Sequence, residues 1–299
     1  MFNKDYYLEM KSGLKSKIRF PEDKPEENLD STLKALWYSA IGKPISAQEA
    51  ARLPIPDLSE KQFQILNELL KLRMNNTPLA HITGRQNFMG IELKSDNRAL
   101  IPRKETEILG TKALEFANIL SCTRSKVNII DVCCGSGNLG IALAHYNPQV
   151  HVFASDLLEE ATELANENIS LLNLKNQVNT FAGDMFEPYE SNNFYGEMDL
   201  VVCNPPYIST SKAKHLSKEV HVNEPVHAFD GGMLGLKIIQ KLIKESPKFL
   251  VPKGWLLFEV GAGQSEFIIK LCKSTKLYDI VKTHPDENGY PRVIYARKK

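Results

Sequence analysis

The sequence is short of the features that mark secreted, membrane-bound and metal-dependent proteins. Its 299 residues include five cysteines, an odd number without paired CxxC spacing, which argues against a disulfide framework and against a zinc site. No apolar run approaches the roughly 18 residues of a membrane span, and the amino terminus lacks the apolar core of a signal peptide. We therefore expect buried thiols, no metal, no membrane association and a cytoplasmic location.

The sequence also lacks an excess of charge of either sign. Its 37 Lys and Arg residues balance 36 Asp and Glu residues, which leaves a net charge of +1. Non-specific nucleic-acid binding needs a basic field that neutralises phosphates. We therefore expect no direct nucleic-acid binding, and we expect a monomer.

The first 85 residues lack strand alternation and read as helices separated by prolines. Apolar residues recur at helical spacing, for example Leu33, Leu36 and Trp37, and Ser59 followed by Gln62 forms a capping-box pattern. The expected helices cover residues 31–41, 46–52 and 59–74. We predict a small helical substrate-binding domain over residues 1–85, followed by an extended connector or β-hairpin over residues 86–104.

Residues 105–299 show a different pattern, in which strands alternate with helices. This alternation predicts crossover units and a mostly parallel, doubly wound α/β sheet. The expected strands cover residues 127–133, 151–156, 178–183, 198–203 and 254–260, and the expected helices cover residues 137–146, 158–172, 235–250 and 264–274. Residues 278–283 and 292–297 predict a terminal hairpin with an antiparallel strand, which is uncommon in dinucleotide dehydrogenases.

A glycine turn joins the first strand to its helix and predicts a nucleotide-cofactor site. Gly135, Gly137 and Gly140 match GxGxxG, and Asp156 ends the next strand, so a nicotinamide cofactor is one interpretation. Three features favour S-adenosylmethionine instead: Asp131 before the turn, Gly183-Asp184 after the third strand, and the residues that end the fourth. The carboxyl ends of neighbouring strands form the crevice where ligands of such sheets bind.

The chemistry of S-adenosylmethionine suggests a role for each of these residues. Asp131 could meet the methionine ammonium and Asp156 could accept both ribose hydroxyls, while Asp184 could accept the adenine amino N–H. Phe181, or Met185 with Phe186, could supply apolar contact to the ring. The predicted cofactor-binding residues are Asp131, Cys133, Gly135, Gly137, Asp156, Leu157, Gly183, Asp184, Met185 and Asn204.

The fourth strand runs directly into Asn204-Pro205-Pro206-Tyr207, which predicts a site for a planar NH2 group. Two consecutive prolines stiffen the main chain and leave its carbonyls available as acceptors. The Asn204 oxygen and the Pro205 carbonyl could accept the two N–H bonds while Tyr207 lies against the amide plane. We predict that Asn204, Pro205 and Tyr207 are catalytic.

Several blocks of the sequence, taken together, carry a family resemblance. They are residues 78–84 (PLAHITG), residues 100–103 (LIPR) with Thr106-Glu107, Asn204 to Tyr207, residues 223–225 (NEP), residues 230–232 (DGG) and residues 291–293 (PRV). With them the chain resembles the HemK/PrmC-type glutamine N5-methyltransferases, class I enzymes that modify the Gly-Gly-Gln loop of peptide chain release factors. The resemblance implies a release factor as protein partner and S-adenosylmethionine as cofactor. It also implies substrate contacts at Asn204, Pro205, Pro206, Tyr207, Ile101, Pro102, Arg103 and Glu224.

The chain departs from the family pattern at the cofactor turn. Cys133 and Cys134 stand where the family has glycine and a small hydroxyl residue, and Lys104-Glu105 replace the usual Pro-Asp. These departures keep open a divergent relative that alkylates a small molecule or another protein. Methylation of adenine N6 in nucleic acid and a cofactor-binding module without chemistry are the further alternatives.

Overall fold

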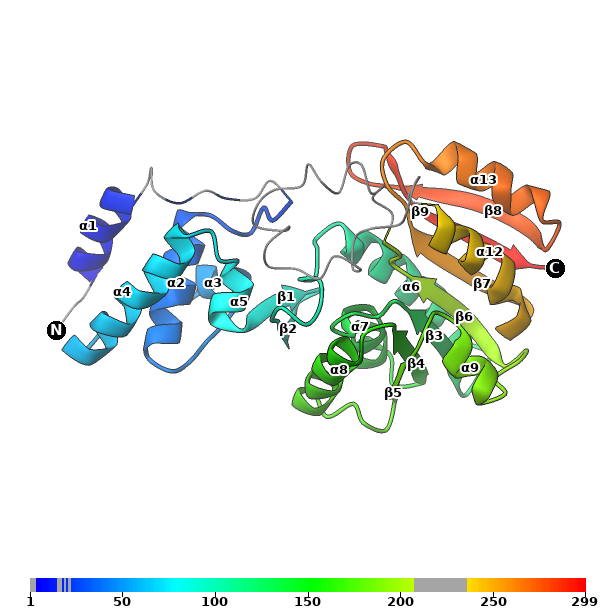
Figure 1. Ribbon diagram of the computed structural model, residues 1–299, viewed down its shortest axis with the longest axis horizontal. Coiled ribbons are helices and arrows are strands. Elements are labelled where there is room, and N and C mark those ends of the chain that lie inside the picture. Colours follow the sequence, from blue (N-terminus) through cyan, green and yellow to red (C-terminus); the bar gives the residue numbers. More distant parts are fainter. Residues whose placement is uncertain (1–3, 15–17, 19, 21–22, 207–235) are drawn as a thin grey trace. The chain divides into compact units, whose positions relative to one another are not determined.

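The computed structural model describes residues 4–14, 18, 20, 23–206 and 236–299, which fold into two units (Figure 1). The first unit contains the described residues up to Asn97 together with Ile101–Lys104. The second contains Arg98–Leu100 and the described residues from Glu105 onward.

The first unit is a helical bundle followed by a short hairpin. Its elements are α1 (Lys4–Leu14), α2 (Leu29–Ala40), α3 (Ala47–Arg52), α4 (Glu60–Met74), α5 (Leu79–Thr83), β1 (Arg85–Phe88) and β2 (Ile91–Lys94). The predicted apolar face of α2 is fully buried at Leu33, Leu36 and Trp37. The predicted capping box is also present, because Ser59 accepts from the Gln62 backbone and the Gln62 side chain accepts from the Ser59 backbone.

The hairpin is closed by a two-residue turn with left-handed backbone, which Gly90 adopts without steric cost. Met89 and Gly90 both have positive φ, at 51° and 84°, as the tight two-residue turns of hairpins require. The Asn87 side chain accepts from the Gly90 N–H at 3.0 Å and closes the turn. Residues 85–94 thus form a hairpin in the first unit, whereas Arg98–Leu100 of the same predicted segment belong to the second unit.

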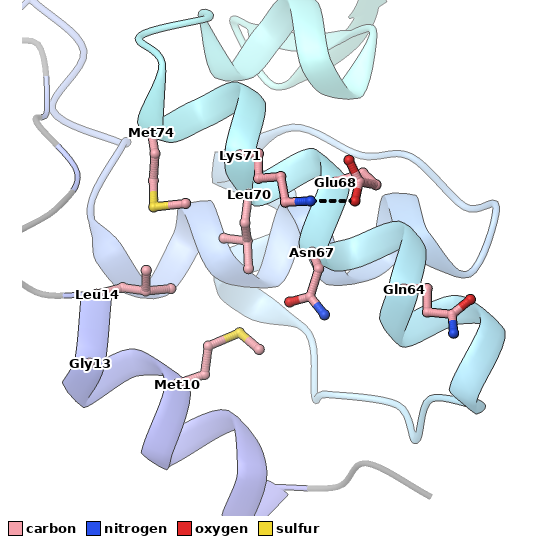
Figure 2. Close-up of a pocket in the computed structure, with 9 residues that line it drawn as sticks. All are labelled: Met10, Gly13, Leu14, Gln64, Asn67, Glu68, Leu70, Lys71 and Met74. Atoms are coloured by element: carbon pink, nitrogen blue, oxygen red, sulfur yellow. Dashed lines mark hydrogen bonds and ion pairs between the residues drawn. The ribbon is translucent and has the colours of Figure 1, made fainter.

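A pocket of about 560 Å³ lies between α1 and α4 of the first unit (Figure 2). Met10 and Leu14 of α1 face Leu70 and Met74 of α4 across it. Its polar lining consists of amides and the exposed ion pair between Lys71 and Glu68. Nothing in this lining offers chemistry for group transfer.

The second unit is built on a seven-stranded sheet in the order β5-β4-β3-β6-β7-β9-β8. The strands are β3 (Val127–Val132), β4 (Val150–Asp156), β5 (Val178–Ala182), β6 (Met198–Cys203), β7 (Leu250–Glu259), β8 (Tyr278–Pro285) and β9 (Pro291–Lys298). Strands β3 to β7 pair in parallel, whereas β9 runs antiparallel to both of its neighbours. The predicted doubly wound sheet with a terminal antiparallel strand is therefore confirmed.

Helices cover both faces of this sheet. They are α6 (Thr106–Ser121), α7 (Asn138–Tyr146), α8 (Glu159–Leu171), α9 (Glu187–Ser191), α12 (Lys237–Phe249) and α13 (Ser265–Ser274). Side chains alternate across a strand, so Ile130 and Val132 join the hydrophobic cluster formed with α9, α12 and α13. Asp131 points to the opposite face, where α7 packs and its Gly140 N–H meets the carboxylate. The strand order reverses between β3 and β6. In open α/β sheets, ligands bind outside the carboxyl ends of the strands at such a reversal.

Candidate active site

Asp131 lies one residue before the end of β3 and is completely buried. Its Oδ2 atom accepts the Gly140 N–H at 2.9 Å. Burial raises the pKa of Asp131 to about 7, with the nearby Asp156 carboxylate adding to the rise and the Gly140 hydrogen bond opposing it. Within the described residues, Asp131 Oδ1 and the Ser136 hydroxyl have no hydrogen-bond partner. A buried carboxylate oxygen that is left unpaired beside the glycine turn suits the ammonium group of a methionine-type ligand.

The glycine turn combines left-handed backbone with close helix packing. Gly135 and Gly137 have φ of 53° and 80°, which glycine adopts without steric cost. Gly140 is required for a different reason, because a Cβ there would lie 2.7 Å from Val152 Cγ1 and 3.1 Å from Asp131 Oδ2. The absence of a side chain at Gly140 therefore lets α7 pack directly against β3 and β4.

Cys133 adopts a conformation that favours glycine, which explains the usual residue at this position. Its φ is 58°, and left-handed backbone costs a non-glycine residue roughly 1–2 kcal/mol. The side chain is half-buried and packs against the core cluster that contains Cys203. Burial, together with the adjoining Cys133 thiol, raises the pKa of Cys203. The departure from the family pattern is thus accommodated by packing.

Asp156 ends β4 and ties the next loop to the glycine turn. Its Oδ2 accepts the Gly135 N–H at 2.8 Å, and its Oδ1 accepts the Leu158 N–H at 3.1 Å. Burial raises the pKa of Asp156, and the backbone N–H groups oppose this rise. The Leu157 N–H also bonds this carboxylate, which leaves one of its roughly four acceptor sites available. Leu157 beside it is 57% exposed, so an apolar side chain stands open to a ligand there.

The end of β5 presents an exposed carboxylate next to a tightly packed loop. Gly183 leaves no room for a side chain, because a Cβ would lie 2.7 Å from Pro188 Cγ. Asp184 is exposed and forms an ion pair with Lys241 at 2.7 Å.

The apolar residues suggested for an adenine ring lie mainly in the core. Met185 is 5% exposed. Phe186 is 1% exposed and stacks on Phe249 with ring centroids 5.0 Å apart. Phe181 is half-buried and packs near Tyr189 and Phe194. The structure thus assigns Phe186 to the core, which corrects the suggestion that its ring flanks the cofactor.

Asn204 follows the last residue of β6 and lies at the opposite side of the strand-order reversal from Asp156. It is half-buried, and Pro205 and Pro206 after it are buried. Its Nδ2 donates to Thr106 Oγ1 at 2.9 Å, and Thr106 Oγ1 donates to Glu259 Oε2 at 2.8 Å. The predicted catalytic Tyr207 and the predicted substrate contact Glu224 lie outside the described residues.

The other predicted substrate contacts belong to the first unit. Ile101 is fully buried, and the Pro102 carbonyl accepts from Gln86 Nε2 at 3.3 Å. Arg103 forms an ion pair with Asp23 at 3.4 Å. The segment is thus held firmly within its own unit.

Sequence reasoning gave no role to Thr106, Glu259 or Arg292. Thr106 bonds Asn204 directly, and Glu259 and Arg292 are linked to it through Thr106. Glu259 offered one signal, since it is a carboxylate at the end of a strand expected in the same sheet. In the part of the chain that the structure describes, no cluster of three or more His, Cys, Asp or Glu side chains has the arrangement of a metal site. None of the described helices has the length and apolar character to span a bilayer.

Comparisons with known proteins agree with this geometry. The family model described as methyltransferase small domain matches residues 110–224. The chain is 33% identical to the release factor glutamine methyltransferase of Thermodesulfovibrio yellowstonii, over 81% of this chain and 84% of that protein. It is also 33% identical to the protein of the same name from Chlamydia trachomatis serovar D, over 84% and 79% of the two chains.

Solved structures that resemble the chain share its fold at low identity. The hMettl16 catalytic domain, solved in complex with the MAT2A 3'UTR hairpin 6, gives a TM-score of 0.52 at 15% identity, over 69% of this chain and 75% of that chain. The sheet order, with its antiparallel β9, and the helices on both faces define a class I methyltransferase fold. The chain belongs to the release factor glutamine methyltransferase family. Its membership confirms the predicted S-adenosylmethionine-dependent methyltransferase.

Proposed function

We propose that this enzyme methylates the side-chain amide nitrogen, N5, of the glutamine in the Gly-Gly-Gln loop of a peptide chain release factor. The observation that carries the proposal is Asn204, half-buried at the carboxyl end of β6, with its amide nitrogen bound to Thr106. This bond leaves the Asn204 oxygen as the acceptor for a substrate N–H. Relatives named release factor glutamine methyltransferase support the choice of substrate.

The residues proposed to hold the cofactor lie at the carboxyl ends of β3, β4 and β5. The unpaired Oδ1 of Asp131 would meet the methionine ammonium, and the Asp156 carboxylate would accept the ribose hydroxyls. The exposed Leu157 and Asp184 would border the adenine, with Met185 beside them. Gly135, Gly137, Cys133 and Gly183 would line the ligand with backbone, and Asn204 would close the site.

Methylation of a carboxamide requires positioning, because the nitrogen lone pair is delocalised into the carbonyl. When bound, S-adenosylmethionine supplies an electrophilic methyl group on a sulfonium centre. Asn204 Oδ1 and the Pro205 carbonyl would accept the two amide protons of the glutamine and raise the electron density on its nitrogen. They would also aim that density at the methyl group, and holding reacting atoms about 3–3.5 Å apart in line lowers the barrier by several kcal/mol.

The proton on the reacting nitrogen leaves after transfer, because the nitrogen carries an extra bond and a positive charge at that point. The Pro205 carbonyl and the Asn204 oxygen would hold this proton until it passes to solvent. We further propose that Pro206, Tyr207 and Glu224 border the amide, and that the helical unit with Ile101, Pro102 and Arg103 seats the release factor.

The experiment that tests the function uses methyl-labelled S-adenosylmethionine with a release factor and with the same factor after its loop Gln is replaced by Ala. We expect label on the first protein and none on the second. Label on both would place the modification elsewhere. Label on neither, with cofactor binding measured by calorimetry, would contradict the proposed substrate and favour a relative that acts on a small molecule or another protein.

A further inference from the structure

A hydrogen-bond chain runs from Asn204 into the second unit. Asn204 Nδ2 donates to Thr106 Oγ1 at 2.9 Å, and Thr106 Oγ1 donates to Glu259 Oε2 at 2.8 Å. Thr106 and Glu259 are each 2% exposed, so water does not compete for these bonds. A buried polar chain whose members are paired holds its side chains in one arrangement.

The direction of this chain is fixed by the carboxylate at its end. The Thr106 hydroxyl donates to Glu259, which faces the Arg292 guanidinium on its other oxygen, so the single hydroxyl proton of Thr106 is committed to Glu259. The Thr106 oxygen must then accept from Asn204, and only the Asn204 amide nitrogen can donate to it. The two ends of an Asn amide are told apart by such a network. The Asn204 oxygen is therefore directed away from Thr106.

The backbone brings these side chains together from distant parts of the sequence. Strands β6 and β7 pair in parallel with Cys203 opposite Phe258, so Asn204 and Glu259 occupy the next positions at the same sheet edge. Thr106 is the first residue of α6, which packs against β7 (Figure 1).

Arg292 forms ion pairs with Glu259, which ends the hydrogen-bond network, and with Glu105. Its Nη2 lies 4.0 Å from Glu259 Oε1 and 2.5 Å from Glu105 Oε2. Glu105 directly precedes Thr106, so the same arginine bridges the helix start to the strand end. Thr106 therefore bonds Asn204 directly, and Arg292 is linked to it through Glu259. Both residues lie in blocks that carry the family resemblance.

We propose that Thr106 and Glu259 are positioning residues that fix the orientation of the Asn204 amide, and so present its oxygen to the substrate NH2 group. The role of that oxygen rests on the proposed function; the orientation itself does not. An inverted Asn204 would present an NH2 group to another NH2 group, which cannot accept its proton. The fixed orientation therefore favours a substrate group that donates an N–H hydrogen bond to Asn204.

The test compares Thr106→Val, Thr106→Ser and Glu259→Gln. Valine keeps the shape of threonine and removes the acceptor, while serine keeps the hydroxyl. Glutamine at position 259 can donate to the Thr106 oxygen, which frees the hydroxyl proton to meet the Asn204 oxygen instead. Thr162→Val is the matched control, because Thr162 is a buried threonine of the same unit whose hydroxyl donates to the Glu159 carbonyl at 2.8 Å.

Two readouts separate positioning from general stability. The first is kcat for methyl transfer, with KM for the release factor and the cofactor Kd measured alongside it. The second is the NMR signal of the Asn204 side-chain NH2 group, assigned by its loss in Asn204→Asp. This second readout needs neither substrate nor cofactor.

We expect Thr106→Val and Glu259→Gln to lower kcat by about 10- to 100-fold, the range that follows from a misplaced reacting group, with the cofactor Kd unchanged. The Asn204 NH2 signal should shift and exchange faster with water in both variants. Thr106→Ser should restore both readouts, and Thr162→Val should move neither.

Unchanged Asn204 NH2 signals in Thr106→Val would overturn the inference, whatever the activity. If Thr106→Val fails to fold, an unchanged signal in Glu259→Gln has the same force. Failure of the proposed function looks different: the wild-type enzyme would leave the release factor unlabelled while the NH2 signals still respond to the variants. Normal kcat in Thr106→Val with a labelled release factor would retain the function and reject the positioning role.

Discussion

Replacing Asp131 by Asn should change how the stability of the second unit depends on pH. Asn keeps an oxygen that can accept the Gly140 N–H, so the variant removes the charge and retains the hydrogen bond. Burial raises the pKa of Asp131 from 3.8 to about 7. The folded protein therefore binds this proton more tightly than the unfolded chain does.

The sign and size of the effect follow from this difference. Between the ordinary pKa and the raised one, the folded state holds a proton that the unfolded state has lost, so stability falls as pH rises. The free energy of unfolding falls by about 1.36 kcal/mol per pH unit well below the raised pKa, and levels off above it. Between about pH 5.5 and about pH 8, Asp131 should lower the free energy of unfolding of the wild-type protein by about 2 kcal/mol. Asp131→Asn should not show this fall.

Urea unfolding at the two pH values measures the effect. The chain has two tryptophans, Trp37 in the first unit and Trp255 in the second. A Trp37→Phe background would let Trp255 fluorescence report on the second unit alone. The stability of Asp131→Asn relative to the parent should rise by about 2 kcal/mol from the lower to the higher pH. An equal difference at both pH values would refute the reasoning that Asp131 is protonated more readily when folded.

Further predictions concern cofactor binding at Asp131 and the packing around two helical glycines. If the ionised Asp131 holds the methionine ammonium, about a tenth of it is charged at about pH 6, so calorimetry should give roughly tenfold weaker cofactor binding there than at pH 8; equal affinity would count against this contact. Gly140→Ala should lower the free energy of unfolding by about 1–3 kcal/mol because its Cβ would crowd Val152 and Asp131. Gly13→Ala in α1, where a Cβ meets nothing within 4 Å, should raise it by about 0.5–1 kcal/mol. Urea unfolding checks both glycine variants, and equal effects from the two would contradict the packing argument.

The parallel strands could be predicted from the sequence because each is a short buried run followed by a turn. The ends of β3, β4 and β6 carry Asp131, Asp156 and Asn204, and parallel pairing brings strand ends to one edge. The main features of the site therefore depend on strand order alone. The conformation of Cys133, by contrast, needed the backbone angles, since nothing in its residue type predicts a positive φ.

Several helices were not predicted because their buried faces carry little apolar signal. Helix α6 buries Ala113, Ala117 and Gly110 beside Leu109, so its packing face consists mainly of small residues. Helix α9 has five residues, too few for a repeated apolar pattern. Helix α1 was also not predicted. Its Tyr7 packs edge-on against Trp37 of α2 with ring centroids 5.6 Å apart, a tertiary contact that the local sequence does not show.

The bonds around Asn204 could not be predicted because they join residues far apart in the sequence. Thr106 is 98 positions from Asn204 and 153 positions from Glu259. Family blocks could be recognised at Thr106 and Arg292, yet their contact with the amide site depends on how α6 packs on β7. Tertiary structure was needed to turn these blocks into a hydrogen-bond chain.

Single-turnover methyl transfer by Asn204→Ala tests whether Asn204 holds the glutamine amide. The loss of one preorganised polar contact costs on the order of 10²- to 10³-fold in rate. We predict a fall of this size for transfer to the release factor at saturating cofactor. Near-normal transfer by Asn204→Ala with intact cofactor binding would contradict the claim.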